Sequence, residues 1–597
     1  MKEFSYPRFT ISLIVGLLVT VVLLTFLEGA GLVGYRTIGL IFFFGTILLY
    51  AALGYMTSTR KVADYFVAGR TVPPLYNGMA GASNWMSAAS VIGMSGTIYL
   101  LGFDGAAYLL GWTGGYVLLA LLVAPYIRKL KAYTVPDFLD ARYGGRYART
   151  VGVICALAMN FVYLIPQFMG VGMIASRFLG LSYQAGVFIA LVSVLFCVYF
   201  GGMRGVTWTQ VAQYVVLIIA FLIPLFGIAF MRTGNPIPWL AWTESMGRVL
   251  AFEKANDITP IVQPFARMSM ANTLGLIFCL MVGTIGLPHV LTRFYTVPSV
   301  RESRTSVGWC LLFIVLLYIS ASAKAIFVRD TIYTDIVGSR YDQLPKWMRD
   351  WGPEGLKLVN YEDKNADGIL QFGELRMHAD MIVISTPEIA GMPYAVSGMI
   401  GAGGMAAAIS TCLGLLMVLA TAVAHDIYKK MLRPGATEAQ VIFWSKIIIV
   451  VVSAISALAA LGRPAIIVEM VAWAFSIAAA TFFPAVVLGL WWRRTNAQGA
   501  LTGMVVGLIV TLGYILMARF FNVTTGAFQW SGPAPAGADA FRIWGFIPIT
   551  AGVFGVPANL IVTYVVSLLT PAPKQEIQDL ITELHFPRET MTLGEGA

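Results

Sequence analysis

Long apolar runs recur from one end of this chain to the other, and they constrain its fold more than any other feature. Of its 597 residues, 58% are hydrophobic and only 12% are charged, about half the charged share of an ordinary soluble domain. A run of about 20 apolar residues can span a bilayer, and in lipid it must satisfy its backbone polar groups internally, as a helix does. We predict an all-α integral membrane protein with about fourteen transmembrane helices. These are expected near residues 11–28, 38–56, 75–101, 106–127, 151–177, 184–202, 207–231, 270–291, 306–328, 393–427, 441–461, 466–492, 498–518 and 543–569.

The basic residues predict the orientation in the membrane. The net charge is +10, and stretches such as "YKKMLR" (428–433) and "WWRR" (491–494) follow apolar runs on the same side. By the positive-inside rule this side is the cytoplasm, which places both termini there, in a bacterial-type inner membrane. No basic patch with interleaved aromatic residues indicates nucleic acid, and no hydrolase or phosphate-binding motif indicates an enzyme. The five cysteines fall within apolar runs and are expected to be buried free thiols.

One polar segment, residues 329–392, interrupts this pattern. It carries 7 basic and 11 acidic residues, a net charge of −4, and the alternation of helices places it outside the cell. Within it, "DKNADGILQFGE" has the spacing of an EF-hand calcium loop, for which we predict a weak structural site that orders the segment over the outer mouth. An acidic turn without an ion is the alternative, since such loops usually occur in pairs and no second one is found. The predicted calcium ligands are Asp363, Asn365, Asp367, Ile369, Gln371 and Glu374.

Two apolar runs are interrupted in mid-membrane. Glycine, alanine and serine crowd "NGMAGASNWMSAASVIGMSGTIYL" (77–100), and Gly283, Gly286 and Pro288 break "LMVGTIGLPHVLTRFYT" (280–296). Each opens a set of five helices, and paired interruptions of this kind indicate the central binding site of a transporter. In the tenth run Ser410 and Thr411 offer hydroxyls that suit a hard cation such as sodium, although hydrogen bonds to their own helix are the alternative.

Several stretches carry a family resemblance. "SNWMSAASVIGMSG", "YTVPDFLDARYG", "VYFGGMRGVTWTQ", "GLPHVLTRFYTV" and "AVAHDIYKKMLRPGATEAQVIFWSKI" resemble the sodium/solute symporter family, and the chain is most similar to its acetate permease-like, cation/monocarboxylate branch. The resemblance covers about residues 38–500. It implies a LeuT-like core of two inverted five-helix repeats, near 75–231 and 270–492, with the first and sixth core helices broken. Residues 1–57 and 498–569 add two helices at each end, and 570–597 form a cytoplasmic tail.

The same resemblance implies a sodium site where the first core helix meets the eighth. Its ligands would be the backbone carbonyls of Ser83, Met86 and Ala407 and the hydroxyls of Ser410 and Thr411. Some relatives carry an acid where this chain has Asn84, so a proton in place of sodium stays open.

The expected function is sodium-coupled symport of a small monocarboxylate of the acetate, propionate or pyruvate class by alternating access. Backbone N–H groups at a half-helix end would bind the anion, so no Arg or Lys is expected deep in the core. Lys324 is expected to extend to the outer interface, and His289 to be a packing residue. The substrate-binding candidates are Ser87, Ser90, Gln167, Thr284 and Gly286.

Alternative functions also remain. Other substrates of the family, such as proline, sugars or pantothenate, are open, as is a transporter-like sensor. The partners expected are a small organic anion and the lipid bilayer, without nucleic acid. A small membrane subunit or a homo-oligomer has no support in the sequence.

Overall fold

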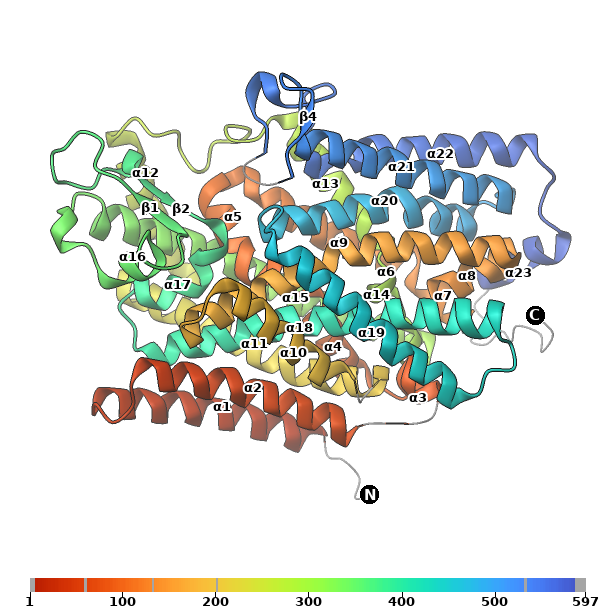
Figure 1. Ribbon diagram of the computed structural model, residues 1–597, viewed down its shortest axis with the longest axis horizontal. Coiled ribbons are helices and arrows are strands. Elements are labelled where there is room, and N and C mark those ends of the chain that lie inside the picture. Colours follow the sequence, from red (N-terminus) through yellow and green to blue (C-terminus); the bar gives the residue numbers. More distant parts are fainter. Residues whose placement is uncertain are drawn as a thin grey trace.

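Long helices lie side by side along the longest axis of the molecule and make up most of it (Figure 1). The computed structural model describes residues 6–585 apart from 58, 60–61, 131–133, 200–201 and 531–533. Its longer helices are α1 (Tyr6–Gly29), α2 (Tyr35–Met56), α6 (Ala106–Leu122), α9 (Gly145–Leu179), α10 (Tyr183–Val198), α11 (Gly202–Thr233), α15 (Val300–Thr331), α18 (Tyr394–Thr421), α19 (Glu438–Leu461), α20 (Ile467–Trp491), α21 (Ala497–Phe520) and α22 (Gly552–Leu569). Short helices α3 (Val62–Val67), α7 (Ala124–Lys129) and α8 (Val135–Tyr143) join them at one end.

The chain is a multi-pass membrane protein, although the predicted number of spans is not confirmed. In its described part, 11 helices are long and apolar enough to cross a membrane, or up to 12 if a bent pair counts as one span. Helix α10 has only 16 residues. The run expected near 75–101 is divided, and its second part continues with the next run as one candidate span, Ala89–Leu122.

Helix α18 lies at the centre of the bundle and is almost wholly buried, whereas α1 exposes most of its surface. Small residues explain this position, because a Cβ at Gly401 would lie 2.3 Å from the Phe178 ring, and one at Gly403 would lie 2.4 Å from the Ala220 side chain. In lipid, close contact between small residues is what holds helices together, since the surrounding tails are as apolar as the side chains.

Both predicted interruptions are present. Helix α4 (Pro74–Trp85) ends at Met86, and the chain continues through a π-helical turn, Ala89–Gly93, into α5 (Met94–Leu101). Helix α13 (Met270–Ile285) is followed by α14 (Pro288–Leu291), with a bend of 46°. Pro288 has no N–H to continue the first helix but starts the second well, which places the break at Gly286 and Leu287.

The polar segment folds at the end of the bundle opposite to α8 and the C-terminal helix (Figure 1). It contains α16 (Lys346–Trp351), the antiparallel strands β1 (Val359–Tyr361) and β2 (Leu375–Met377), and α17 (Ile382–Ile389). An ion pair of 2.9 Å between Arg177 and Glu388 attaches it to α9. Two further short strands, β3 (Phe521–Asn522) and β4 (Ala527–Phe528), pair between α21 and α22.

Two helices lie outside the predicted spans. Helix α12 (Pro238–Ala255) packs on α15, and α23 (Gln575–His585) forms within the segment expected to be only a polar tail. Helix α23 is amphipathic: it buries Ile581 and Leu584, and Lys129 donates a 2.6 Å hydrogen bond to the Leu584 carbonyl. Apolar residues at helical spacing explain its docking. The last part of the predicted tail, 586–597, is outside the described residues.

Candidate functional site

The hydroxyls of Ser410 and Thr411 face the end of α4, as predicted. Ser410 Oγ lies 2.6 Å from the Ser83 carbonyl and 2.8 Å from the Ala407 carbonyl. Thr411 Oγ1 lies 2.9 Å from the Asn84 carbonyl and 3.2 Å from that of Ala407. Both side chains are fully buried. Five oxygen atoms from two helices therefore surround one point at the break, and all are neutral.

Met86 lies at the break, where its N–H donates to the Ala82 carbonyl at the end of α4. Its carbonyl as a sodium ligand stays a prediction. The Asn84 carbonyl, which was not predicted as a ligand, faces Thr411. The carbonyls of Ser83 and Asn84 thus meet neighbouring hydroxyls on the facing helix.

The Asn84 side chain begins a buried polar network. Its amide nitrogen donates to the His289 carbonyl at 3.3 Å, and its oxygen accepts from Gln210 at 3.3 Å. Gln210 also donates to the Ser410 carbonyl at 2.6 Å and accepts from Arg293. The network joins the ion-site helices to the second break.

Two basic side chains lie deep in the protein, so the prediction that none would do so is wrong. Lys324 is fully buried: its Nζ donates to the Phe221 carbonyl at 2.9 Å and lies 3.6 Å from the centre of the Phe221 ring. These contacts replace the water that an interfacial lysine would reach. Arg293 is also buried, and no carboxylate in the described part of the chain lies within ion-pair distance of it.

A second group of polar atoms lies between the two breaks. Ser87 and His289 are each 1% exposed. In the described part of the chain neither His289 ring nitrogen has a hydrogen-bond partner. The Tyr163 phenol lies within hydrogen-bonding reach of the Ser87 hydroxyl, and its ring meets the His289 ring edge-on at 5.3 Å. Buried polar groups are seldom left unpaired, so these atoms are suited to a ligand.

The other predicted substrate residues already have partners. Gln167 accepts a 3.0 Å hydrogen bond from the Ala88 N–H and supports the unwound chain. Ser90 shares a 3.2 Å hydrogen bond with Tyr318, and Thr284 donates to its own helix. Gly286 has a packing role, because a Cβ there would lie 2.4 Å from the Ala478 carbonyl.

Aromatic rings enclose this group. Phe475 lies at their centre, with ring centroids 5.7 Å from Trp85, 5.8 Å from Trp112 and 5.9 Å from Tyr163. The Trp85 indole donates to the Tyr318 hydroxyl at 3.0 Å. The polar atoms between the two breaks therefore have an apolar, aromatic surrounding.

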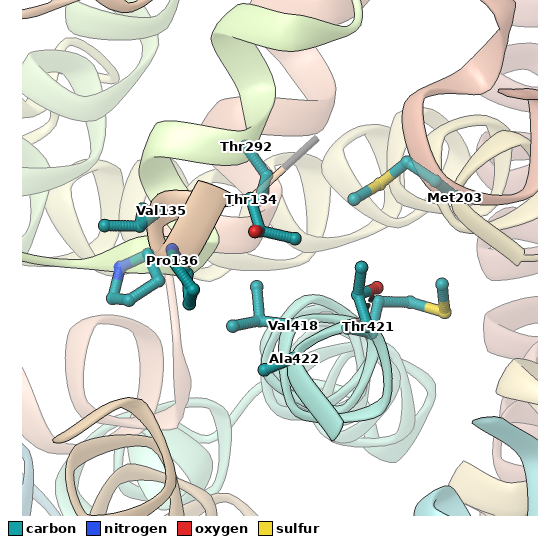
Figure 2. A pocket seen from close by; sticks show the side chains of 10 residues that line it. Thr134, Val135, Pro136, Met203, Thr292, Val418, Thr421 and Ala422 are labelled. Carbon is teal, nitrogen blue, oxygen red and sulfur yellow. Dashed lines mark hydrogen bonds between the residues drawn. The ribbon is translucent and has the colours of Figure 1, made fainter. Parts of the chain in front are cut away.

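A small pocket of about 10 Å³, room for about one water molecule, adjoins the second break on the side of α8. Figure 2 shows Val418, Thr421 and Ala422 facing Thr134, Val135, Pro136 and Thr292 across it, with Met203 at one side. Pro288 also lines it, so the pocket reaches the start of α14.

Charged residues fasten the chain beside this pocket. Arg149 contacts Asp137 at 3.1 Å, Asp426 at 3.6 Å and also Asp140, and Thr134 donates to Asp426 at 3.0 Å. Asp137 and Asp426 lie close enough to His425 to hold a metal ion. The Arg149 guanidinium already offsets part of the negative charge of the three carboxylates, and the cluster therefore reads as an ion-pair network.

The six predicted calcium residues lie in one loop at the other end of the bundle. Gly368 has a φ of +73°, the left-handed conformation that the sixth position requires. Glu374 accepts hydrogen bonds from the N–H groups of Gln371 and Lys364, which lower the pKa of its carboxyl, and the Ile369 N–H lowers the pKa of Asp367. One oxygen of Asp363, Oδ1, is buried without a partner.

The chain at Gly338 and Ser339 pairs with the middle of this loop. The Leu370 N–H donates to the Ser339 carbonyl at 2.9 Å, and the Gly338 N–H donates to the Leu370 carbonyl at 2.8 Å. β1 and β2 flank the loop where an EF-hand would have helices.

Comparison with known proteins identifies the family. The family model described as "Sodium:solute symporter family" matches residues 65–342 and 374–507. The chain belongs to the sodium:solute symporter family. An uncharacterized symporter of Cupriavidus necator is 37% identical to this symporter, with 92% of this chain and 93% of the relative aligned. A monocarboxylic acid transporter of Corynebacterium glutamicum is 27% identical, with 88% of this chain and 90% of the relative aligned.

A solved structure agrees with this assignment. A Na⁺-coupled sialic acid symporter in a substrate-bound outward-open state has a TM-score of 0.66 and 17% identity, covering 90% of this chain and 98% of its own. At this identity the likeness concerns the fold, which is that of a sodium-coupled carrier. The match to the family model is interrupted between residues 342 and 374, and this gap contains nearly the whole calcium-like loop of this symporter.

Proposed function

We propose that this symporter couples sodium entry to the uptake of a small monocarboxylate. The observation that carries the proposal is that two groups of buried oxygen and nitrogen atoms meet at the first break. On one side are the hydroxyls of Ser410 and Thr411 with their carbonyl partners, and on the other are Ser87 and His289. A single ion can therefore order the chain that forms the substrate site.

The sodium site consists of the carbonyls of Ser83, Asn84 and Ala407 and the two hydroxyls. Sodium takes oxygen ligands, and a neutral site holds the ion weakly enough to release it. The Met86 carbonyl, at the break, would complete the predicted set of sodium ligands. When sodium binds, it pulls the end of α4 onto α18, and Ser87 follows directly in the chain.

The substrate site favours a small anion. Ser87 and His289 have unused hydrogen-bonding groups, and the buried cation Arg293 connects to the His289 backbone through Gln210 and Asn84. A buried cation without a carboxylate nearby attracts negative charge. The aromatic enclosure limits the size of the solute, in keeping with the name of the Corynebacterium relative.

Alternating access follows from the two breaks. From outside, sodium and the carboxylate order the first break against α18. The core then opens at the pocket beside Pro288 and Thr292, toward the cytoplasm, where sodium is scarce and both solutes leave. Each sodium ion that enters at 100 mV contributes about 2.3 kcal/mol, although one sodium with one monoanion moves no net charge.

Uptake into proteoliposomes tests this function. A sodium gradient should drive uptake of labelled acetate or pyruvate, and unlabelled monocarboxylates should compete where proline, glucose and pantothenate do not. Ser410→Ala and Thr411→Ala should each raise the sodium concentration that half-maximal uptake requires. Thr46→Ala is the matched control, because Thr46 is a buried threonine of α2 that bonds only to its own helix. Unchanged uptake in both ion-site variants would contradict the sodium-site assignment, and competition by proline instead would contradict the substrate class.

For the loop 363–374, we propose a calcium clamp. This proposal is supported by the full ligand pattern, by the unpaired Asp363 oxygen and by the segment at Gly338 and Ser339 that pairs with Leu370. Calcium is abundant outside cells, so a site of about 10⁻⁴–10⁻³ M affinity would stay filled. Calcium should raise the melting temperature of the purified protein, and Glu374→Gln should remove that effect. If chelation and Glu374→Gln change neither stability nor transport, the clamp proposal fails.

A further inference from the structure

A second pocket lies on the face of the molecule that carries the polar segment, away from the two breaks. Its volume is about 400 Å³, and Arg267, Arg329 and Arg376 all line it. Arg267 lies in the chain between α12 and α13, Arg329 near the end of α15, and Arg376 on β2. Three separate elements thus each contribute one guanidinium to one hollow.

Arg329 is the most buried of the three arginines in this pocket. It is only 4% exposed, donates to Glu253 at 2.7 Å and to the Tyr99 carbonyl at 2.5 Å, and keeps Nε without an acceptor. A buried donor without a partner is costly, and for a charged group the cost is greater.

The other two guanidiniums are less constrained. Arg267 donates only to the carbonyls of Thr259 and Pro260, and Arg376 is exposed. In the described part of the chain neither has a carboxylate within 4.0 Å. Burial and the positive charge of Arg329 lower the pKa of Arg267.

The acids nearest Arg267 and Arg329 are already engaged. Glu253 is engaged by Arg329 and also accepts from the Ile261 N–H. Asp104 is buried and accepts three backbone hydrogen bonds, from Phe265, Arg267 and Met268. Arg376 also lines a neighbouring hollow, together with Glu362, Lys364 and Glu374.

We propose that this pocket is a binding site for a small oxyanion, separate from the central site. Guanidinium groups bind carboxylate and phosphate oxygens by paired hydrogen bonds, so the ligand is either a free monocarboxylate or inorganic phosphate. The monocarboxylate alternative rests on the proposed function, whereas the phosphate alternative does not.

The position of the pocket gives the anion a role. Arg329 holds the last turn of α5 through the Tyr99 carbonyl, and Tyr99 donates to the Met377 sulfur at 3.6 Å. Helix α5 is the continuation of the broken first core helix. An anion bound by the three guanidiniums would therefore stabilise α5 and the polar segment in their present arrangement.

Thermal unfolding of the full-length protein tests the site. The purified protein is held in a neutral detergent and sodium-free choline chloride at constant ionic strength, and choline acetate or choline phosphate is titrated in. At least one anion should raise the melting temperature in a saturable way. Arg267→Gln and Arg376→Gln should each raise the half-saturating anion concentration about tenfold, the usual effect of losing a charged hydrogen bond. Arg340→Gln is the control, because Arg340 is an exposed arginine of the same segment that pairs only with Asp342.

The two anions distinguish the sources. Saturation by acetate identifies the carboxylate, and saturation by phosphate alone identifies the inorganic anion and leaves the site independent of the transported solute. If neither anion stabilises the wild type, or both variants respond as the wild type does, the proposal is wrong. Failure of acetate uptake into proteoliposomes would overturn the proposed function but not a phosphate response here.

Discussion

Replacing Ser410 by alanine should weaken sodium binding while leaving the fold intact. The Ser410 hydroxyl bridges α18 and α4, 2.6 Å from the Ser83 carbonyl and 2.8 Å from that of Ala407. The substitution removes one buried oxygen and almost no volume. A hydrogen bond to a charged group contributes about 1.5–3 kcal/mol, and 1.4 kcal/mol corresponds to a factor of ten. The half-saturating sodium concentration should therefore rise roughly 10- to 150-fold.

Sodium-dependent uptake of a labelled monocarboxylate into proteoliposomes measures this effect. Because coupling between two ligands is reciprocal, the Ser410→Ala variant should also bind the substrate more weakly when sodium is below saturation, and recover when it is in excess. Thr411→Ala should act in the same direction, and the double variant should be less than additive because both hydroxyls contact the Ala407 carbonyl. An unchanged sodium dependence in Ser410→Ala, with Thr46→Ala also normal, would refute the assignment.

Three further predictions concern the fold around the site. Gly286→Ala should lower uptake and cost about 1–3 kcal/mol of stability, because its Cβ would lie 2.4 Å from a carbonyl oxygen of α20. Uptake and melting assays measure both effects. Gly308→Ala is the control, because a Cβ at Gly308 meets nothing within 4 Å. Arg149→Gln should destabilise the protein by about 3 kcal/mol in thermal unfolding, since it leaves buried Asp426 without its cation. Burial raises the pKa of Asp380 in the folded protein above its value in the unfolded chain. The folded state therefore loses stability as the pH rises from the unfolded pKa to the folded pKa. Asp380→Asn should therefore melt higher than the wild type at neutral pH, and the difference should vanish toward pH 4.

Local chemistry explains which parts of the site could be predicted from the sequence. Gly286 and Pro288 interrupt a helix wherever they occur, and the two breaks lie where these residues and the small residues near Ser87 place them. The hydroxyls of Ser410 and Thr411 face the end of α4, because position along a helix determines the face. The sequence did not indicate the contact between Thr411 and the Asn84 carbonyl, which depends on the rotation of α4 about its axis.

Contacts between distant segments account for the other differences. Lys324 has an apolar stem that fits either an interface or an interior, and only the neighbouring Phe221 decides between them. Arg293 follows an apolar run like any cytoplasmic arginine, yet Thr207 and Gln210 of α11 accept its hydrogen bonds. The "GLPHVLTRF" stretch did contain His289 and Arg293, so the signal was present. Their role depends on partners more than 80 residues away in the chain.

The polar segment contacts two helices of the bundle, α5 and α20. Asp380 accepts a 3.3 Å hydrogen bond from the Ile467 N–H at the start of α20. A Cβ at Gly96 of α5 would lie 1.9 Å from the Ala379 carbonyl, so the helix and the segment touch backbone to backbone. Glu374 and Asp380 are joined only by β2 and one short turn. The calcium-like loop therefore lies within six residues of the contacts that the segment makes with α5 and α20.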